Sequence, residues 1–442
     1  MRLLYFSPVH AGSYAQRPHF MVRAWLEWGI ESVLWVNPYP CRLPRWQDLL
    51  RKGDPGKLGM PLDPRIRVLD VPALPIEPLP LGPWLNRRLL GRNAWREIEH
   101  FASSADCPNF RVSENGTAPF GNASGSDFPV CQDNRSRQGG QKRLPRRIEN
   151  GELVLGIGRP CDLALAAIRR LRPAGSFFDA MDNFPEFHRG LSRRAMRRHE
   201  DAVAAEVDLV VASSTFLAEK FTNRGLRVET VLNAFEEINK GGEGERGRLE
   251  KDDDALSSLL PVSSSPSLPF PVLGYLGCIG RWFDWPLVIG LAEALPDVRI
   301  ELVGPCVVPP PKRPPTNVWL LPACKQSETA SRLSRFSAGL IPFRNDALTA
   351  GVDPIKYYDY RAAGLPVLST RFGEMALRGR DDGVYFLDQA GNLAEAVSAA
   401  LGHRRDAAAI SQFRRNNNWT SRFLQSNSLR SLLPASRIRR AA

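Results

Sequence analysis

Two glycines and an arginine follow an apolar run at the start of the second half of the chain, at Gly277, Gly280 and Arg281. Glycine lets a ligand approach the backbone closely, and an arginine side chain is a forked donor that fits a diphosphate. The residues before them predict a strand and those after them a helix, so the loop between is a predicted anion site. As a bare Gly-x-x-Gly the signal is weak, and its place in the fold must support it.

The beginning of the chain repeats this arrangement. Residues 2–6 predict a strand, Gly12 lies in the loop after it, and a helix is predicted from Arg17. Arg17 could reach a phosphate and His19 could hydrogen-bond a sugar hydroxyl, or both could lie in an exposed first turn of the helix. The loop lacks the Gly-x-Gly-x-x-Gly spacing, which argues against a dinucleotide site.

Two acids and a histidine follow a predicted strand at residues 176–179. Asp179 and Asp182 lie where that strand leaves its sheet, and loops at this edge line ligand sites in α/β proteins. These carboxylates could orient an acceptor hydroxyl or act as a general base, and His188 shares their loop. They could equally cap the helix that follows.

Asp359 lies in a segment that joins a helix to a strand. Gly364 ends the helix, Pro366 follows, and residues 367–370 predict a buried strand. In a doubly wound sheet, ligands collect at such loops and helix ends. A carboxylate here could accept two hydrogen bonds from vicinal hydroxyls, or it could be an acid on a helix surface.

Strands and helices alternate through both halves of the chain, which predicts an α/β fold with parallel sheets. A chain of 442 residues exceeds what one core usually serves. We expect a first domain at residues 1–235 and a second at 269–405, followed by a helix and a basic tail at 406–442. Residues 103–150 and 236–268 are polar and aperiodic, which predicts a disordered insertion in the first domain and a linker between the two.

The composition limits the class of protein. Seven cysteines at scattered spacings, without a Cys-x-x-Cys pair, argue against a disulfide framework and a zinc site. The formal charge of +12 favours phosphate-bearing partners, an anionic membrane surface among them. No helix-turn-helix or RNA-binding pattern is present, so we expect no nucleic-acid partner. No apolar run is long enough to span a bilayer, and we expect a cytoplasmic protein.

Residues 353–370 resemble the donor-site signature of GT-B glycosyltransferases of the retaining, family-4-like group. That signature places a Glu before an Ala-x-Gly-x-Pro-Val run, and here Asp359 takes the place of the Glu before residues 363–367. The family signature contains two Glu residues separated by seven others, and Asp359 matches the second of them. The position of the first is Gly351 in this chain, and Asp353 is offset from it by two. The resemblance therefore implies a variant site.

The resemblance implies two Rossmann-like doubly wound domains that face each other across a cleft, with a final helix that crosses back to the first. It implies that Arg281, Lys356 and Asp359 carry the chemistry, with Lys356 on a phosphate and Asp359 on the ribose hydroxyls. As a lone lysine on a helix, Lys356 would otherwise be a solvated surface residue. The remaining implied donor-site residues are Gly12, Gly277, Gly280, Gly304, Pro305, Ala323, Asp353 and Tyr360. The implied acceptor-side residues are Arg17, His19, Asp179, Asp182 and His188.

The implied reaction moves a sugar from a nucleotide-sugar donor to a hydroxyl of a glycan or lipid-linked acceptor, in cell-surface polysaccharide or glycolipid assembly. We expect no metal or other cofactor, because fixed cations and helix dipoles can stabilise a departing diphosphate. Two alternatives stay open. The absent first Glu favours an inactive protein of this fold that binds sugar nucleotides or a membrane, and a sugar-nucleotide epimerase would keep the fold with other chemistry. We also expect peripheral contact with the inner face of the cell membrane.

Overall fold

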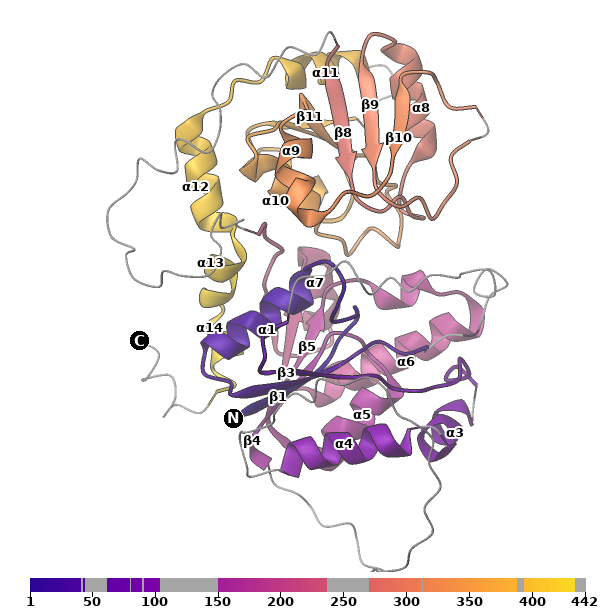
Figure 1. The fold of residues 1–442 in the computed structure, drawn as a ribbon, viewed down its shortest axis with the longest axis vertical. Helices are drawn as coiled ribbons and strands as arrows, with labels where there is room; N and C mark the ends of the chain where they lie inside the picture. The colour runs from indigo at the N-terminus through magenta and orange to yellow at the C-terminus, as the bar shows by residue number, and fades with distance from the viewer. Residues whose placement is uncertain are drawn as a thin grey trace, which may run out of the picture.

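The structure, a computed structural model, describes residues 1–40, 43, 62–79, 81–89, 91–103, 150–236, 270–311, 313–387 and 393–433. The predicted insertion at 103–150 and the predicted linker at 236–268 lie almost entirely outside these residues, and so does the basic end of the chain. Two groups of elements, one above the other in Figure 1, make up the described part.

The first group is built on a seven-stranded parallel sheet with the order β3-β2-β1-β4-β5-β6-β7. Its strands are β1 Arg2–Phe6, β2 Ser32–Val36, β3 Ile66–Leu69, β4 Asn150–Ile157, β5 Pro173–Ala180, β6 Leu209–Ala212 and β7 Val228–Thr230. Its helices are α1 Arg17–Glu27, α3 Gly82–Leu89, α4 Arg92–Ser103, α5 Asp162–Leu171, the 3₁₀ helix η2 Phe184–Phe187, α6 Gly190–Glu206 and α7 Thr215–Thr222. We call this group the N-lobe.

The second group is built on a six-stranded parallel sheet with the order β10-β9-β8-β11-β12-β13. Its strands are β8 Val272–Leu276, β9 Arg299–Val303, β10 Val318–Leu321, β11 Ala338–Ile341, β12 Val367–Ser369 and β13 Val384–Phe386. Its helices are α8 Trp285–Ala294, η4 Gln326–Glu328, α9 Thr329–Leu333, α10 Ile355–Ala362, η5 Gly373–Arg378 and α11 Leu393–Leu401. We call this group the C-lobe.

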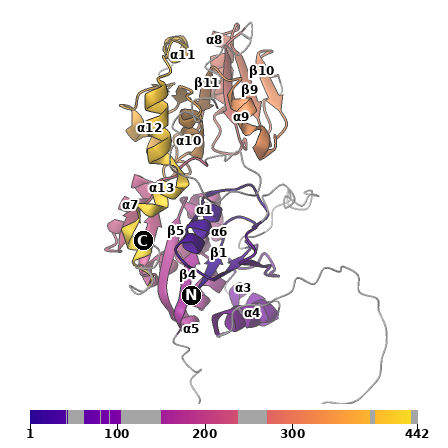
Figure 2. The same cartoon turned by 60° about the vertical axis from the view of Figure 1, so that its left-hand side comes forward.

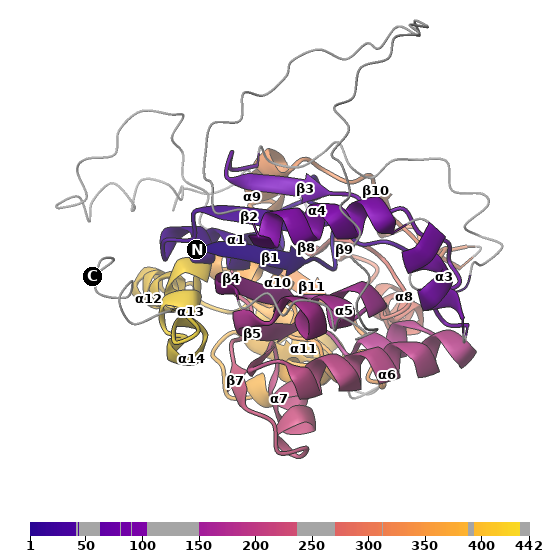
Figure 3. The ribbon, with the colours of Figure 1, turned by 90° about the horizontal axis from the view of Figure 1, so that it is seen from below.

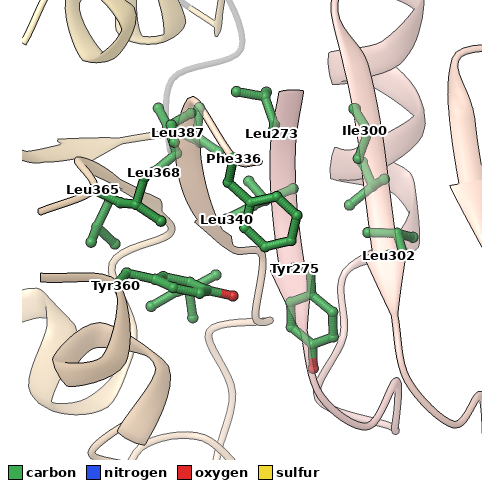
Figure 4. Packing of buried hydrophobic residues seen from close by; sticks show 14 of the residues in the cluster. Leu273, Tyr275, Ile300, Leu302, Phe336, Leu340, Tyr360, Leu365, Leu368 and Leu387 are labelled. Atoms are coloured by element: carbon green, nitrogen blue, oxygen red, sulfur yellow. The ribbon is translucent and has the colours of Figure 1, made fainter. Parts of the chain in front are cut away.

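Both sheets have apolar side chains on both faces, as parallel sheets covered by helices require. In the N-lobe, clusters on the two faces of the sheet alternate along β1, with Leu4 in one and Tyr5 in the other. Seen from below in Figure 3, α4, α5 and α6 cover one face of this sheet. In the C-lobe, a single cluster includes the residues of Figure 4, where the Tyr360 ring lies beside Leu340 and Leu365.

The last described helices run from the C-lobe to the N-lobe along one side of the molecule (Figure 2). They are α12 Ala407–Asn417, α13 Trp419–Leu424 and α14 Asn427–Arg430. Trp419 stacks on Phe20 of α1, with ring centroids 4.9 Å apart. The Phe235 N–H donates to Asn417 O at 3.1 Å, so this crossing lies beside the chain where it leaves the N-lobe.

The predicted α/β architecture with parallel sheets is confirmed, and the differences are local. The helix α3, in a proline-rich part of the chain, has no counterpart in the sequence prediction. The short strand β13 has no counterpart in the sequence prediction, and the described part of residues 406–442 contains three helices, α12 to α14, where one was expected. None of the described helices is both long enough and apolar enough to cross a bilayer.

Candidate donor site at the facing edges of two sheets

The loops that follow the strands of one sheet contact the loops that follow the strands of the other. Three of the hydrogen bonds between the lobes join a side chain of the N-lobe to a backbone carbonyl of the C-lobe: Tyr14 Oη to Cys324 O at 3.3 Å, Asn183 Nδ2 to Ala347 O at 3.2 Å, and Ser214 Oγ to Gly351 O at 3.0 Å. The carboxyl edges of the two sheets therefore face each other, which is where α/β proteins bind ligands.

Lys356 of α10 lies at the carboxyl end of β8, against the loop that contains Gly277. Its Nζ lies 5.0 Å from the centre of the Tyr275 ring and 5.6 Å from that of Phe343. A Cβ at Gly277, whose φ is +142°, would come within 2.7 Å of Nζ. Among the described residues the ammonium has no hydrogen bond and no carboxylate within ion-pair distance. Burial lowers the pKa of Lys356, and the charge of Asp359 opposes that shift.

Asp359 lies one helical turn beyond Lys356 on the same face of α10. Burial raises the pKa of the Asp359 carboxyl to about 7, Lys356 opposes the shift, and the nearby Glu236 adds to it. The Glu236 carboxylate accepts a hydrogen bond from Gln326 in the loop after β10. The Lys356 ammonium and the Asp359 carboxyl of the C-lobe therefore lie near the Glu236 carboxyl, which follows the last strand of the N-lobe.

The glycines of this region are sites of close backbone approach. Gly304, with φ +141°, would place a Cβ 2.3 Å from Gly277 O, so the loops after β8 and β9 approach this closely only because residue 304 has no side chain. At Gly280 a Cβ would collide with the Trp282 ring. Pro305 and Ala323, predicted donor-site residues in the loops after β9 and β10, are exposed at the same edge of the sheet.

Arg281 joins the lobes at this edge. Its Nη2 donates to Phe187 O of the N-lobe at 2.9 Å. Phe187 ends η2, the short helix that follows Asp182 and precedes His188. The predicted main cation of the second half therefore lies next to the predicted acceptor-side loop of the first.

Asp353 and Tyr360 were predicted to bind the donor, and the structure gives both a different environment. The Asp353 carboxylate is buried and accepts hydrogen bonds from Asn233 N at 2.7 Å, Tyr358 Oη at 2.9 Å and Arg378 Nη2 at 2.7 Å. The Tyr360 hydroxyl accepts from Leu276 N at 3.0 Å, and its ring packs on Gly339. Protein groups therefore already bond the Asp353 carboxylate and the Tyr360 hydroxyl.

Arg17 and Asp179 form a buried ion pair inside the N-lobe. Arg17 Nε lies 2.8 Å from Asp179 Oδ1, and Arg17 Nη1 donates to Val231 O at 2.6 Å. Burial raises the pKa of Asp179, and Arg17 opposes that shift. The guanidinium predicted to reach a phosphate thus ties α1 to β5 and to the residue after β7.

His19 is held by the backbone of its own loop. Its Nδ1 accepts from Gln16 N at 3.2 Å, and its Nε2 lies 3.1 Å from Ala11 O, to which a neutral ring protonated at Nε2 donates. Burial lowers the pKa of His19, in keeping with a neutral imidazole. Gly12 lies partly buried in the same loop. The His19 side chain was predicted to bond a sugar hydroxyl, but both of its ring nitrogens already bond the backbone of the loop.

Asp182 remains the acceptor-side acid at the interface of the lobes. It is partly exposed, and burial with the nearby Asp179 charge raises its pKa to about 7. No side-chain cap bond is found at the start of η2 or of α6, so capping does not account for it within the described residues. Its neighbour Asn183 bonds across to the C-lobe.

Three residues of this region were not selected from the sequence: Tyr14, Glu236 and Gln326. Tyr14 lies two residues after Gly12 in the predicted loop, and this position is the only feature of the sequence that could have indicated it. Glu236 falls at the start of a polar stretch, where an acid carries no signal. Gln326 forms no recognisable motif with other polar residues of the sequence. All three become visible only when the lobes are placed together.

No protein-family model and no curated protein matches the chain. Solved structures do match, among them α,α-trehalose-phosphate synthases from three Burkholderia species. That from Burkholderia xenovorans, in complex with glucose-6-phosphate, has 12% identity and a TM-score of 0.53, with 98% of this chain and 99% of that chain covered. The synthase from Burkholderia multivorans has 12% identity and a TM-score of 0.52, with 98% of each chain covered. The synthase from Burkholderia vietnamiensis has 11% identity and a TM-score of 0.52, with 98% of this chain and 100% of that chain covered.

At this identity the likeness concerns the fold, which is the GT-B arrangement of two Rossmann-like sheets. The fold class expected from the resemblance is confirmed.

Proposed function

We propose that this protein is a glycosyltransferase that moves a sugar from a nucleotide-sugar donor to an acceptor hydroxyl. The observation that carries the proposal is the Lys356 ammonium, which lies at the carboxyl end of β8 without a counter-ion among the described residues. An unpaired cation that is partly buried is costly, and a phosphate at this edge of the sheet would compensate its charge. The likeness to trehalose-phosphate synthases supports the fold needed for such a donor site.

In this proposal the donor diphosphate lies over the loop from Gly277 to Arg281, with Lys356 beside it. The bond between the sugar and the diphosphate breaks, the acceptor oxygen forms the new bond to the sugar, and its proton passes to the departing diphosphate. The two cations stabilise the charge that develops on the departing diphosphate, and no metal is needed for that role. Asp359, one turn from Lys356, accepts hydrogen bonds from the ribose hydroxyls.

The acceptor approaches from the N-lobe side, where Asp182 and His188 lie in the loop next to the Arg281 contact. We infer a retaining reaction of the family-4-like type from the resemblance in residues 353–370. The acceptor we expect is a glycan or a lipid-linked sugar, used in cell-surface polysaccharide or glycolipid assembly at the inner face of the cell membrane.

A second candidate is an inactive protein of the same fold that binds the nucleotide-sugar without transfer. Gly351, the position of the absent first Glu, favours it. A Cβ there would lie 3.2 Å from Leu217 and 3.4 Å from Asn183 of the N-lobe, so a glutamate would press into the interface. The site would then hold a donor with fewer carboxylates than the family has.

Titration calorimetry with uridine and guanosine diphosphates tests the donor site. We expect one of them to bind, and Lys356→Met to weaken it by at least about tenfold, since a hydrogen bond to a charged group contributes roughly 1.5–3 kcal/mol. Asp359→Ala should also weaken it. Arg404→Met, a change at an exposed cation of the C-lobe, is the matched control and should bind normally.

Transfer and hydrolysis assays over a panel of nucleotide-sugars then separate the two candidates. Turnover with any donor supports the transferase, while binding without turnover supports the inactive binder. Absence of both binding and turnover with every donor would remove the proposal. Unchanged affinity in Asp359→Ala would remove the ribose role alone.

A further inference from the structure

Residues 74–86 of the N-lobe bury polar side chains and expose apolar ones. Glu77 and Asn86 are buried, whereas Leu79, Leu81 and Trp84 are 39%, 72% and 49% exposed. Folding normally produces the opposite distribution, because transfer of a leucine or tryptophan into an apolar environment is favourable. A group of exposed large apolar side chains on one segment marks an interaction surface.

Specific contacts hold this segment in place. The Glu77 carboxylate accepts from Asp162 N at 2.7 Å and lies 3.5 Å from His199 Nδ1, which fixes it to α5 and α6. The Asn86 amide bonds both N and O of Leu74, at 2.9 Å each. Gly82 lies so close to Ile76 O that a Cβ would come within 1.8 Å. The exposed leucines and tryptophan are therefore presented by an ordered platform.

Exposed arginines accompany these apolar groups on α3 and α6. The Arg88 guanidinium lies 5.2 Å from the centre of the Trp84 ring. The start of α6 adds the exposed Leu191 with Arg194 and Arg198, and neither arginine has an ion pair among the described residues. The helices α3 and α6 lie on the same side of the N-lobe in Figures 1 and 3, in agreement with the contact between Glu77 and His199.

We propose that this α3–α6 surface, made of Leu79, Leu81, Trp84, Arg88, Leu191, Arg194 and Arg198, binds the surface of an anionic lipid bilayer. Tryptophan and leucine enter the boundary of the acyl chains, and arginine keeps its charge at the phosphates. Nucleic acid would pair with the arginines and leave Leu81 in water. The net charge of +12 adds long-range attraction to such a membrane. The docking does not depend on the proposed transferase activity, which would only explain why a lipid-linked acceptor is reached there.

Flotation with lipid vesicles tests the proposal. The full chain should float with vesicles of phosphatidylcholine and phosphatidylglycerol. With vesicles of phosphatidylcholine alone it should remain at the bottom of the gradient. Arg194→Gln with Arg198→Gln should weaken binding roughly 30-fold, since each arginine near an anionic surface contributes about fivefold. Leu81→Ser and Trp84→Ser, tested separately, should each weaken it further, and the binding should fall as salt rises.

Matched controls use equally exposed groups of the C-lobe. Leu377→Ser replaces a leucine that is 63% exposed, and Arg404→Gln with Arg405→Gln removes two charges. These variants should float like the parent. Equal flotation with neutral vesicles, or equal losses in α3–α6 and control variants, would overturn the proposal, as would no vesicle binding by the parent. Calorimetry with nucleoside diphosphates on the same samples distinguishes this failure from that of the donor site.

Discussion

The two lobes each place a cation near the start of a helix at their shared interface, and they treat it differently. Arg17 of the N-lobe is fully buried and paired with Asp179 at 2.8 Å. Lys356 of the C-lobe has aromatic rings around it and no paired carboxylate among the described residues. A buried ion pair within one lobe holds that lobe together, whereas an unpaired cation has charge left for a ligand. The difference supports the proposal that the donor diphosphate binds to the C-lobe.

The same substitution at both cations tests this contrast most strongly. Arg17→Met should lower the free energy of unfolding by about 3–5 kcal/mol, because it leaves Asp179 buried without its counter-ion. Lys356→Met should leave that free energy unchanged or raise it, since the ammonium has a desolvation cost and no partner. Urea denaturation measures both. The double variant Arg17→Met with Asp179→Leu should regain much of the loss, and equal losses for the two single variants would erase the contrast.

The buried carboxyl of Asp359 makes the stability of the protein depend on pH. The pKa of Asp359 is raised to about 7 by burial, from 3.8 in the unfolded chain. Between these values the folded state holds the extra proton, so this group costs stability progressively as pH rises from about 4 to 7. Asp359→Asn removes the cost, by about 1.4 kcal/mol for each pKa unit.

Unfolding free energies of parent and Asp359→Asn, measured from pH 4 to pH 7, should therefore diverge in favour of the variant. Asp382→Asn, at a carboxylate whose side chain is 80% exposed, is the control and should run parallel to the parent. A difference that does not change with pH would mean that Asp359 is an ordinary surface acid.

Much of the fold was predictable, because strands and helices carry their pattern locally. The strand after Gly364 and the loop at Gly277 lie as predicted, since each depends on residues adjacent in sequence. Pairing across the chain was not predictable. Arg17 meets Asp179 only because β1 and β5 lie in one sheet, and nothing local to either residue indicates it.

The candidate site shows the same limit. Asp353 and Asp359 are six residues apart on one segment, and the sequence offers both as donor ligands. Of the three partners of the Asp353 carboxylate, Tyr358 lies on the same segment, whereas Arg378 and Asn233 come from elsewhere in the chain. Asn233 belongs to the other lobe. Spacing can propose a carboxylate for a ligand, but only the assembled lobes decide whether protein groups already use it.

Glycines with positive φ allow a smaller test of the two lobes. Gly277 of the C-lobe has φ +142° and a Cβ there would meet Lys356, whereas Gly29 of the N-lobe has φ +95° with open space around it. Substitution by alanine should destabilise both by about 1 kcal/mol or more through backbone strain. Only Gly277→Ala should also weaken nucleoside diphosphate binding, because it displaces the ammonium. Normal binding by Gly277→Ala would separate Lys356 from the donor site.

The smallest expected effect concerns His19. Its folded pKa is lowered by burial, so the unfolded chain binds the proton more readily, and the contribution of this group to stability is complete above the unfolded value of 6.5 and is lost as pH falls. The ring hydrogen bonds to Gln16 N and Ala11 O stay in place when a ligand occupies the C-lobe edge. The His19 signals in an NMR titration should therefore show the lowered pKa and should not move when a nucleoside diphosphate is added. A ligand-dependent shift would mean that the N-lobe loop reaches the phosphates after all, and that a histidine bonded to its own backbone can still serve the site.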